Sequence, residues 1–500
     1  MRKLHRLAVS IDQLWPAVVL AGFLFYVSLM PLSPNDFWWH LKIGEIIFET
    51  RSVPTTNMFA WTLPTDAPFV YGAWLGELLL YVLHRWGGLA LVTFVRNGVT
   101  LAAFWLMAGA ARARSGSWRI AALALAFGCA MSLNNLVVRP QLWSLLPFVL
   151  YAMLLRRYAA GALHCAWLLA CPLIMVFWAN AHGAFVLGFA LLGIYFAGEL
   201  VKRVLGVEGA LPWRRVGWLA VMGGLTGLAA LANPQGIGIV NYVAGLMGDQ
   251  PSQELVVEWQ SPSPSGIANV VFYASILALL AVLAYSRYRP GPTELLLLLA
   301  FLWLAWSGQR YVIWYALLVM PILAEAVAGL LSRAPRGPQN RKWLYSATAA
   351  VLFVPAVLAQ PWWVERLPLP EAYWSQVQMG AEAGPLVDTT TPVDAVAYLR
   401  EHPGGKLYHE MGYGSYLIWA LPEQGVFVDP RVELYPYEQW RDYSSIGQGF
   451  NYGKLLAKYG ADRVLLDLAT QGELGLALQD DMAWAREYGD AYSEIWAAKQ

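Results

Sequence analysis

The sequence predicts an α-helical polytopic membrane protein that carries a small α/β domain at its C-terminal end. Of the 500 residues, 58% are hydrophobic and 13% are charged, and the mean hydropathy is +0.45, far outside the usual composition of soluble globular proteins. Charge is also divided unevenly, because residues 388–500 hold 17 Asp and Glu against 9 Lys and Arg, whereas the preceding part is basic. A basic membrane part and an acidic soluble domain explain both observations.

Apolar segments long enough to cross a bilayer recur along residues 1–360. A transmembrane helix needs about 20 mostly apolar residues, and the hydropathy predicts about eleven such segments. Their approximate centres are residues 23, 98, 125, 148, 172, 192, 224, 277, 301, 320 and 351. The first segment follows a basic start and has no small-residue cleavage site, so we expect it to be retained as the first span.

Lysine and arginine fall in alternate connections between these segments. Short loops rich in these residues stay on the cytoplasmic side. The basic connections contain Arg2, Lys3 and Arg6; Arg112, Arg114 and Arg119; Arg156 and Arg157; Lys202, Arg203, Arg214 and Arg215; Arg287 and Arg289; and Arg333, Arg336, Arg341 and Lys342. We therefore expect a cytoplasmic N-terminus, with a large first outer loop at 33–86 and the C-terminal domain on the outer face.

The C-terminal part has the pattern of a soluble α/β domain at 388–500, preceded by a linker at 361–387 that contains "PWW" and "LPLP". Within the domain, "TTPVDAVAYLREHPG" predicts a capped helix and "YGKLLAKYGA" predicts a helix closed by Gly460. Two short strands are expected at "GVFVDPRV" and "DRVLLD".

The expected strand "GVFVDPRV" and the residues after it contain three charged side chains, Asp429, Arg431 and Glu433. Alternation along a strand would place all three on one face, where they either pair with one another or serve a site. Mutual ion pairing is the simpler interpretation. The acidic excess of the domain argues against nucleic acid as a partner and is compatible with a protein partner that docks on it.

Polar side chains gather at the predicted outer ends of the spans. Such groups are costly in a bilayer, which makes them the first candidates for a functional site. They are Asp36, His40, Glu45, Glu77, Asn134, Asn135, Arg139, Gln141, Asn180, His182, Asn233, Gln235, Glu254, Glu258, Gln309 and Arg310. We therefore expect chemistry on the outer face.

In "NDFWWHLKIGE", Asp36 and His40 are one helical turn apart and lie on one face of the expected helix. A carboxylate beside apolar walls can act as a general base or as a metal ligand. Alternatively, Asp36 caps an interfacial helix whose Trp38 and Trp39 lie at the level of the lipid headgroups. The two roles are compatible.

Two further motifs contain candidate site residues, each with two interpretations. Asn180 and His182 lie at a turn in "WANAHGAF", where the histidine is either a hydrogen-bonded structural residue or a catalytic one. Glu258 in "VVEWQSPSP" is either an ordinary loop carboxylate or a site residue turned toward Asp36.

Arg139 in "VVRPQ" and Arg310, beside Gln309 in "SGQRY", are cations on the predicted outer side. A guanidinium there suits a phosphate or pyrophosphate, which it can bind through two hydrogen bonds. Anchoring to lipid headgroups is the alternative. The sequence holds no glycine-rich phosphate loop and no HExxH, CxxC or GxSxG motif, so no nucleotide cofactor is expected.

This layout resembles the type C membrane glycosyltransferases (GT-C), and more closely a bacterial family of glycosyltransferase-like polytopic proteins. The resemblance rests on an acid just after the first span, and on the motifs "NDFWWHLKIGEIIFETRSVPTTNMFAWT", "YGAWLGELLLYVL", "VRPQLWSLLPF", "WANAHGAF", "NPQG", "VEWQSP" and "GYGSYLIWALPEQGVFVDPRVELY". It covers most of the chain and implies the GT-C fold in a bacterial inner membrane, with the C-terminal domain periplasmic.

The resemblance also implies a chemistry. The donor would be a sugar on a polyprenyl phosphate bound together with membrane lipid, and the acceptor would be a hydroxyl of a glycan, a lipid or a protein. Asp36 would take the proton of that hydroxyl or orient it. Arg310, and after it Arg139, would bind the departing phosphate with Gln309, and His182 would donate a hydrogen bond to it.

The chain departs from the family pattern in two places. Many members have two adjacent acids in the first loop, where this chain has Asn35 and Asp36, and "NNLVVR" stands where a second-loop acid is expected. A divalent metal ion, if one takes part, would be held by Asp36 and Glu258. Two other functions stay open: a non-catalytic scaffold or assembly subunit, and a transporter or polymerase of lipid-linked glycans.

Overall fold

The computed structural model describes residues 9–331, 342–378 and 384–499. The chain forms two compact units. Unit 1 consists of Met1–Met30, Val92–Ile239 and Val256–Leu367, and unit 2 consists of Pro31–Leu91, Val240–Leu255 and Pro368–Gln500. Each unit is therefore assembled from segments far apart in the sequence, whereas the sequence-based boundaries at 1–360, 361–387 and 388–500 divide the chain along its length. Residues 379–383 of that predicted linker lie outside the described residues.

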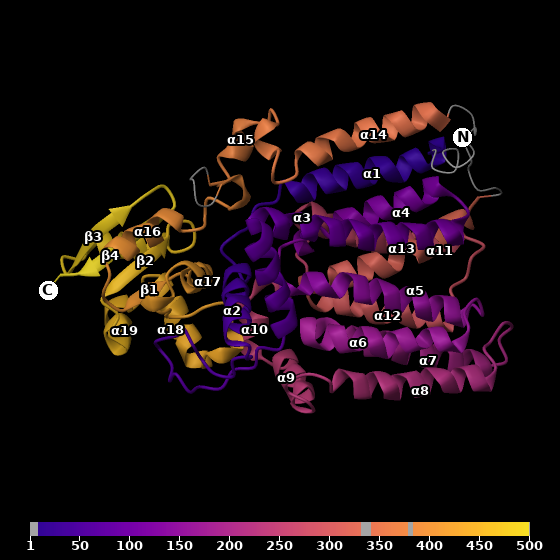
Figure 1. Ribbon diagram of the computed structural model, residues 1–500, viewed down its shortest axis with the longest axis horizontal. Helices are drawn as coiled ribbons and strands as arrows, with labels where there is room; N and C mark the ends of the chain where they lie inside the picture. Colours follow the sequence, from indigo (N-terminus) through magenta and orange to yellow (C-terminus); the bar gives the residue numbers. More distant parts are fainter. Residues whose placement is uncertain (1–8, 332–341, 379–383, 500) are drawn as a thin grey trace. The chain divides into compact units, whose positions relative to one another are not determined.

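Unit 1 is a bundle of helices that lie side by side with nearly parallel axes (Figure 1). They are α1 (Ile11–Ser28), α4 (Trp118–Met131), α5 (Leu145–Ala159), α6 (Ala170–Ala181), α7 (Val186–Val204), α8 (Trp213–Ala230), α11 (Ile267–Tyr285), α12 (Pro292–Ser307), α13 (Val312–Ala328), α14 (Lys342–Leu358) and the later part of α3 (Trp74–Ser115). Every predicted span centre falls inside one of these helices. The prediction of a polytopic helical membrane protein is confirmed.

Length and composition distinguish two groups among these helices. Five helical stretches, which contain α1, α3, α7, α11 and α13, are long and apolar enough to cross a membrane. The stretches that contain α4, α6, α12 and α14 are apolar but shorter. α3 is broken at Gly87 and Gly88, whose backbone angles are not helical, so its first part ends where the predicted outer loop ends.

α13 forms the core of unit 1. It packs against α4, α11 and α12, and every side chain from Val312 to Ala324 is buried. A helix that is apolar on all sides suits either a protein core or a membrane span. The burial of α13 shows that protein, in the form of α4, α11 and α12, covers most of its surface.

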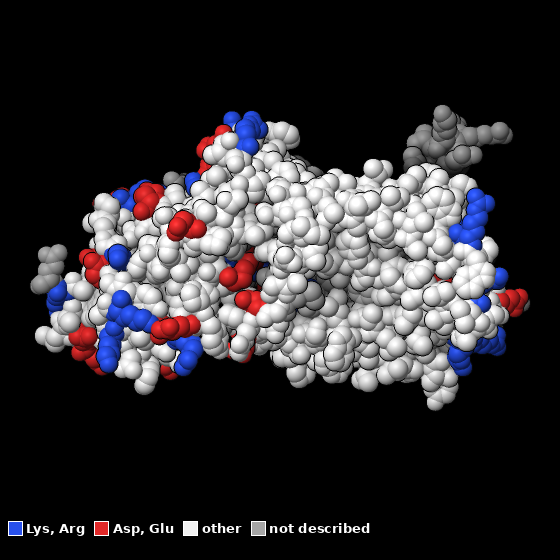
Figure 2. Space-filling view, turned by 90° about the horizontal axis from the view of Figure 1, so that it is seen from below, with Lys and Arg blue, Asp and Glu red and all other residues white. Residues whose placement is uncertain are grey.

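Cationic side chains gather at one end of the bundle, where α3, α5 and α7 end and α4, α8 and α12 begin. In Figure 2 the flank of unit 1 is white, and blue side chains lie at its right-hand end. This is the end that the sequence predicts to be cytoplasmic. Six cations of that prediction lie outside the described residues, namely Arg2, Lys3, Arg6, Arg333, Arg336 and Arg341.

Unit 2 contains a four-stranded sheet with the order β1-β2-β4-β3. β1 (Leu407–His409) is parallel to β2 (Arg463–Asp467), and β4 (Ser493–Ala498) is antiparallel to β2 and to β3 (Trp484–Gly489). Its helices are α2 (Phe37–Thr50), the first part of α3, part of α9 (Gly238–Met247), α10 (Gln250–Leu255), α15 (Glu371–Trp374), α16 (Val393–Glu401), α17 (Met411–Ala420), α18 (Tyr437–Gly447), α19 (Tyr452–Tyr459) and α20 (Gly472–Asp480). The predicted α/β character is confirmed.

Most local predictions for the C-terminal segment are confirmed. α16 and α19 are the expected helices, Gly460 ends α19 in the left-handed conformation with φ of 70°, and β2 is the strand expected at "DRVLLD". α16 begins after Pro392 without the expected side-chain cap.

The strand predicted at "GVFVDPRV" is wrong, because this segment contains a turn. Val426 forms an isolated bridge with Ala60, but Pro430 has no N–H to donate to a sheet. The Asp429 carboxylate then accepts the Arg431 N–H at 2.9 Å and binds the Arg431 guanidinium at 2.8 and 2.6 Å. The predicted ion pairing is therefore confirmed for these two residues, which are fully buried.

His409 in β1 is fully buried and supports the same segment. Its Nε2 atom accepts the Phe427 N–H at 3.0 Å, and its Nδ1 atom lies 2.8 Å from the Glu410 carbonyl oxygen. Both contacts suit the neutral ring, with the proton on Nδ1. Burial lowers the pKa of His409 to about 4.

We expect acid to destabilise unit 2 through His409. The pKa of this group is about 4 in the folded state against 6.5 ordinarily, so the unfolded chain takes up the proton first as the pH falls. The contribution of His409 to stability is fully present above pH 6.5 and should decrease by about 1.4 kcal/mol per pH unit down to about pH 4. Melting temperatures across this range would measure it, and His409→Gln, which keeps an acceptor for Phe427, should weaken the dependence. An equal pH dependence in both proteins would contradict the assignment.

Two glycines of α7 test the packing of unit 1. A Cβ atom on Gly198 would lie 2.5 Å from the Thr293 Cα atom of α12, whereas one on Gly193 would have no atom within 4 Å. We expect Gly198→Ala to destabilise the protein by about 1–3 kcal/mol because the two helices must separate, and Gly193→Ala to be neutral or slightly stabilising because alanine favours helix. Thermal unfolding of the purified protein measures both, and equal melting temperatures would refute the close packing.

Candidate functional site

The predicted site residues form two groups. Unit 2 contains Asp36, Trp38, Trp39 and His40, and unit 1 contains Arg139, Asn180, His182, Glu258, Gln309 and Arg310. The first group combines an acid, a histidine and aromatic rings. The second contains two cations, an acid, a histidine and two amides.

The start of α2 is held in place by α17. The Ser415 hydroxyl donates to the Asn35 carbonyl at 2.5 Å and accepts the Trp39 N–H at 3.1 Å. Gly412 lies so close to the carbonyl of Pro34 that a Cβ atom there would overlap with it. The small residues of "MGYGS" thus fix the backbone of "PND", which is the stretch that presents Asp36.

Asp36 occupies the N-cap position of α2, but its side chain makes no capping hydrogen bond. The Asn35 side-chain oxygen takes that position and accepts the Phe37 N–H at 3.4 Å. The interpretation of the Asp36 carboxylate as a helix cap is therefore wrong, because the neighbouring amide does this work. The Asp36 side chain itself is half-buried.

His40 is paired with Glu77, which lies in the first part of α3. The His40 Nδ1 atom is 2.8 Å from Glu77 Oε1, and the two residues are 8% and 1% exposed. Glu77 Oε2 is buried without a hydrogen-bond partner among the described residues. The sequence shows both residues in the first outer loop, but no short motif indicates their pairing, since 37 positions separate them.

Trp38 and Trp39 are buried, at 3% and 8% exposure, so their rings pack against other residues of the protein. Trp38 packs edge-on against Tyr416 of α17, with ring centroids 5.1 Å apart. The Trp39 ring lies 3.6 Å from the His40 ring and 6.0 Å from the guanidinium carbon of Arg431. Segments distant in sequence cover both indoles, which the pattern of α2 alone does not reveal.

Arg431 is surrounded by partners from two parts of unit 2. Besides Asp429, its guanidinium donates to the Tyr71 hydroxyl at 3.0 Å, and the rings of Phe59 and Phe69 lie 5.5 and 5.3 Å away. Burial alone raises the pKa of Asp429, but the charge and the hydrogen bonds of Arg431 hold it below its usual value. The pair is therefore ionised, and it joins the first loop to the C-terminal segment.

In unit 1, four predicted residues come together at the end of the bundle away from the cationic end. Arg139 and Glu258 form an ion pair with an N–O distance of 2.5 Å, and the Arg310 guanidinium lies 4.3 Å from the centroid of the Trp259 ring. Both arginine charges act on Glu258 and on His182. Two cations and one acid leave a net positive charge, which suits an anionic ligand.

His182, which follows α6, is oriented by hydrogen bonds at one ring nitrogen. Nδ1 accepts the Ala184 N–H at 3.1 Å and lies 3.1 Å from the Ser144 hydroxyl, which also accepts the Trp178 indole N–H at 2.8 Å. A neutral ring held in this way carries its proton on Nε2. The structural and the catalytic interpretations are therefore compatible, because Nδ1 fixes the ring and Nε2–H is a donor.

Asn180 and Gln309 belong to amide networks. Asn180 donates to the carbonyls of Val176 and Ala232 at 2.8 and 2.7 Å. Gln309 accepts hydrogen bonds from Asn135 and Asn269, both at 3.2 Å. These bonds connect helix ends to one another and favour a structural role for both amides.

The described part of the chain contains no group of three or more His, Cys, Asp or Glu side chains that could hold a metal ion. Asp36 and Glu258 are the ligands that the sequence suggests if a metal takes part. They belong to different units, and Glu258 Oε2 accepts a hydrogen bond from Arg139.

Two solved structures resemble this architecture. The apo oligosaccharyltransferase of Archaeoglobus fulgidus matches over 97% of this chain and 74% of its own, with a TM-score of 0.54 and 12% identity. Apo ArnT of Cupriavidus metallidurans matches over 96% and 97%, with a TM-score of 0.52 and 15% identity. This chain has the GT-C fold. The predicted GT-C architecture is thus confirmed at the level of the fold, while no protein-family model and no curated protein matches the sequence.

The energy of the buried His40–Glu77 contact can be measured by a double-mutant cycle with His40→Ala and Glu77→Ala. We expect a coupling energy of about 1–3 kcal/mol, because each single variant leaves a buried polar partner. Lys42 and Glu45, on the same helix at 2.6 Å but 21% and 22% exposed, provide the control, with an expected coupling of at most about 1 kcal/mol. A coupling no larger than that of the control would show that the His40–Glu77 pair does not support the fold.

Proposed function

We propose that this protein is a membrane glycosyltransferase, which moves a sugar from a polyprenyl-phosphate donor to an acceptor hydroxyl on the outer face of the membrane. The observation that carries the proposal is the cluster at the helix ends of unit 1, in which Arg139, Arg310 and Glu258 leave a net positive charge beside the neutral His182. The GT-C fold supports it, because the two solved relatives are an oligosaccharyltransferase and ArnT.

Arg310 is our first choice for the donor phosphate. Its guanidinium face is covered by Trp259, and stacking of this kind leaves the N–H edge of the guanidinium for a bidentate contact with phosphate oxygens. Arg139 already donates to Glu258. We therefore expect it to act on the donor phosphate mainly through its positive charge. The Nε2–H of His182 would donate to the same phosphate, since both arginine charges act on that ring.

Asp36 is our choice for the base. In the proposed step the acceptor oxygen attacks the anomeric carbon and its proton passes to the Asp36 carboxylate. The bond from that carbon to the phosphate oxygen breaks, and the phosphate leaves with the electron pair. Cations beside the leaving phosphate lower the barrier because its negative charge develops in the transition state.

We expect Asp36→Asn to lower sugar transfer by about 10²–10⁴-fold, because the amide keeps the shape but cannot take a proton. Glu45→Gln, a change of the same kind in the same helix, should leave transfer unchanged. The measurement is transfer of labelled sugar from polyprenyl-phosphate donors to a panel of acceptors, in membranes with matched expression of each variant.

Two outcomes would overturn this proposal. Equal transfer by the wild type and Asp36→Asn would remove Asp36 as the base. Absence of transfer from every donor by the wild type, together with loss of a membrane complex when the protein is deleted, would favour the non-catalytic scaffold.

A further inference from the structure

A polar cavity of about 320 Å³ lies in unit 1, between α3, α5, α7, α12 and α13. It is at the cationic end of the bundle, whereas the cluster around His182 is at the other end. His182 and Glu199 are 17 positions apart along α7 and the turn that precedes it. At 1.5 Å per residue this separation corresponds to roughly 25 Å. The cavity is therefore separate from the proposed donor site.

Six charged side chains line this cavity, and their charges balance. They are the cations Arg114, Arg156 and Lys202 and the acids Glu199, Glu294 and Glu325. A cation or an anion alone would therefore leave an uncompensated charge in a partly buried place, which is costly. A ligand without net charge avoids this cost, and one that carries both signs can in addition bind a cation and an acid of the lining.

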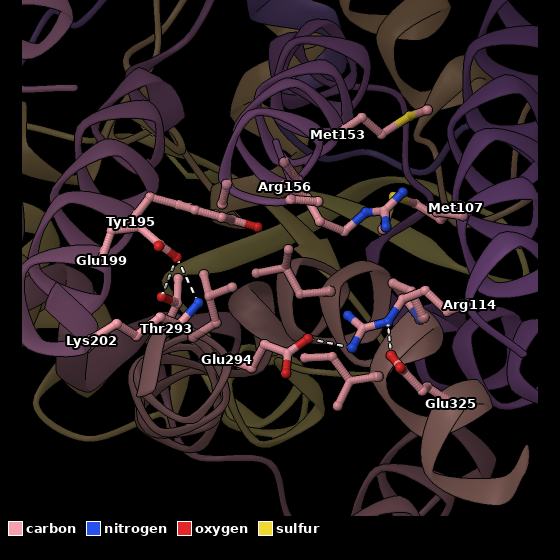
Figure 3. A pocket seen from close by; sticks show the side chains of 18 residues that line it. Met107, Arg114, Met153, Arg156, Tyr195, Glu199, Lys202, Thr293, Glu294 and Glu325 are labelled. Carbon is pink, nitrogen blue, oxygen red and sulfur yellow. Dashed lines mark hydrogen bonds and ion pairs between the residues drawn. The ribbon is translucent and has the colours of Figure 1, made fainter. Parts of the chain in front are cut away.

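Several of these groups bind one another within the protein. Arg114 donates to Glu294 and to Glu325. Lys202 and Thr293 both donate to Glu199 Oε1, at 2.7 and 2.9 Å. These contacts are the dashed lines in Figure 3.

Among the described residues, one buried acceptor and one buried donor in the lining lack a hydrogen-bond partner. They are Glu199 Oε2 and Arg156 Nε. Figure 3 shows the Arg156 guanidinium well apart from the Glu199 carboxylate, with the Tyr195 ring reaching toward Arg156. Buried polar atoms are nearly always satisfied in folded proteins, by protein or by bound molecules such as water, so these two atoms are the places where a molecule in the cavity would bind.

We propose that this cavity binds a zwitterion with a primary ammonium and a phosphate group, that is, the phosphoethanolamine group of a lipid or of a free metabolite. The ammonium would donate to Glu199 Oε2, and the phosphate oxygens would accept from Arg156. An N–H donor is required on the cation because Oε2 is an acceptor. The cavity lies at helix ends, where the headgroups of the surrounding lipids are found, and its volume is of the size that small-molecule sites have.

The selectivity of the wild type is the first test. Melting temperatures would be measured for the full chain in nanodiscs of dioleoylphosphatidylcholine, and again after part of this lipid is replaced by dioleoylphosphatidylethanolamine or by dioleoylphosphatidylglycerol. We expect a rise with the ethanolamine lipid only, because choline has no N–H and glycerol has no cation. Soluble O-phosphoethanolamine, added to the protein in phosphatidylcholine nanodiscs, distinguishes a free ligand from a lipid.

Variants then locate the site. Each of the variants Arg156→Gln and Glu199→Gln removes one charge-assisted hydrogen bond. We therefore expect each variant to bind the probe that raises the wild-type melting temperature about 10–100-fold more weakly. Arg157→Gln, which changes the exposed neighbour of Arg156 that is not part of the cavity lining, should bind as the wild type does.

The proposal is wrong if neither probe raises the melting temperature of the wild type, or if the phosphatidylcholine and phosphatidylglycerol nanodiscs stabilise it as much as the ethanolamine lipid does. It is also wrong if the two cavity variants keep the response of the wild type. Since the sugar-transfer assay is not used, failure here would leave the proposed function untouched.

Discussion

A bilayer offers no hydrogen bonds to a polar group inside it, and this constraint determines where the chemistry of unit 1 can lie. The helices are apolar over their length, so charged side chains are confined to two layers at the helix ends. One layer contains Arg139, Glu258 and Arg310, and the other contains Arg114, Glu199 and Glu325. Because α13 is buried over most of its length, the bundle between these layers has an apolar core.

The guanidinium groups of three buried or half-buried arginines, Arg431 in unit 2 and Arg310 and Arg156 in unit 1, have different partners. Arg431 is fully buried and donates to Asp429 and Tyr71, which is the arrangement of a structural ion pair. Arg310 is stacked on Trp259, which leaves its N–H edge for a ligand. Arg156 keeps a buried nitrogen without a partner, which is costly unless something else binds there.

In unit 2, the Arg431–Asp429 pair and the contacts of α17 join the first loop to the C-terminal segment. A buried ion pair is weak evidence for stability by itself, since desolvation offsets much of the attraction. Its effect here is on position: Arg431 lies against Trp39, and Ser415 holds the backbone on both sides of Asp36. The proposed catalytic acid is thus presented by a scaffold that two distant parts of the chain build together.

The sequence by itself determined the helices of unit 1, because hydropathy over about 20 residues reports what a bilayer requires, and all predicted span centres lie in helices. It also determined local features such as β2 and the end of α19 at Gly460. Only the tertiary structure decided that "GVFVDPRV" turns at Asp429, that His40 pairs with Glu77, and that Asn35 rather than Asp36 caps α2. These outcomes depend on partners distant in sequence or on the exact direction of a side chain, and neither is encoded in the periodicity of a single segment.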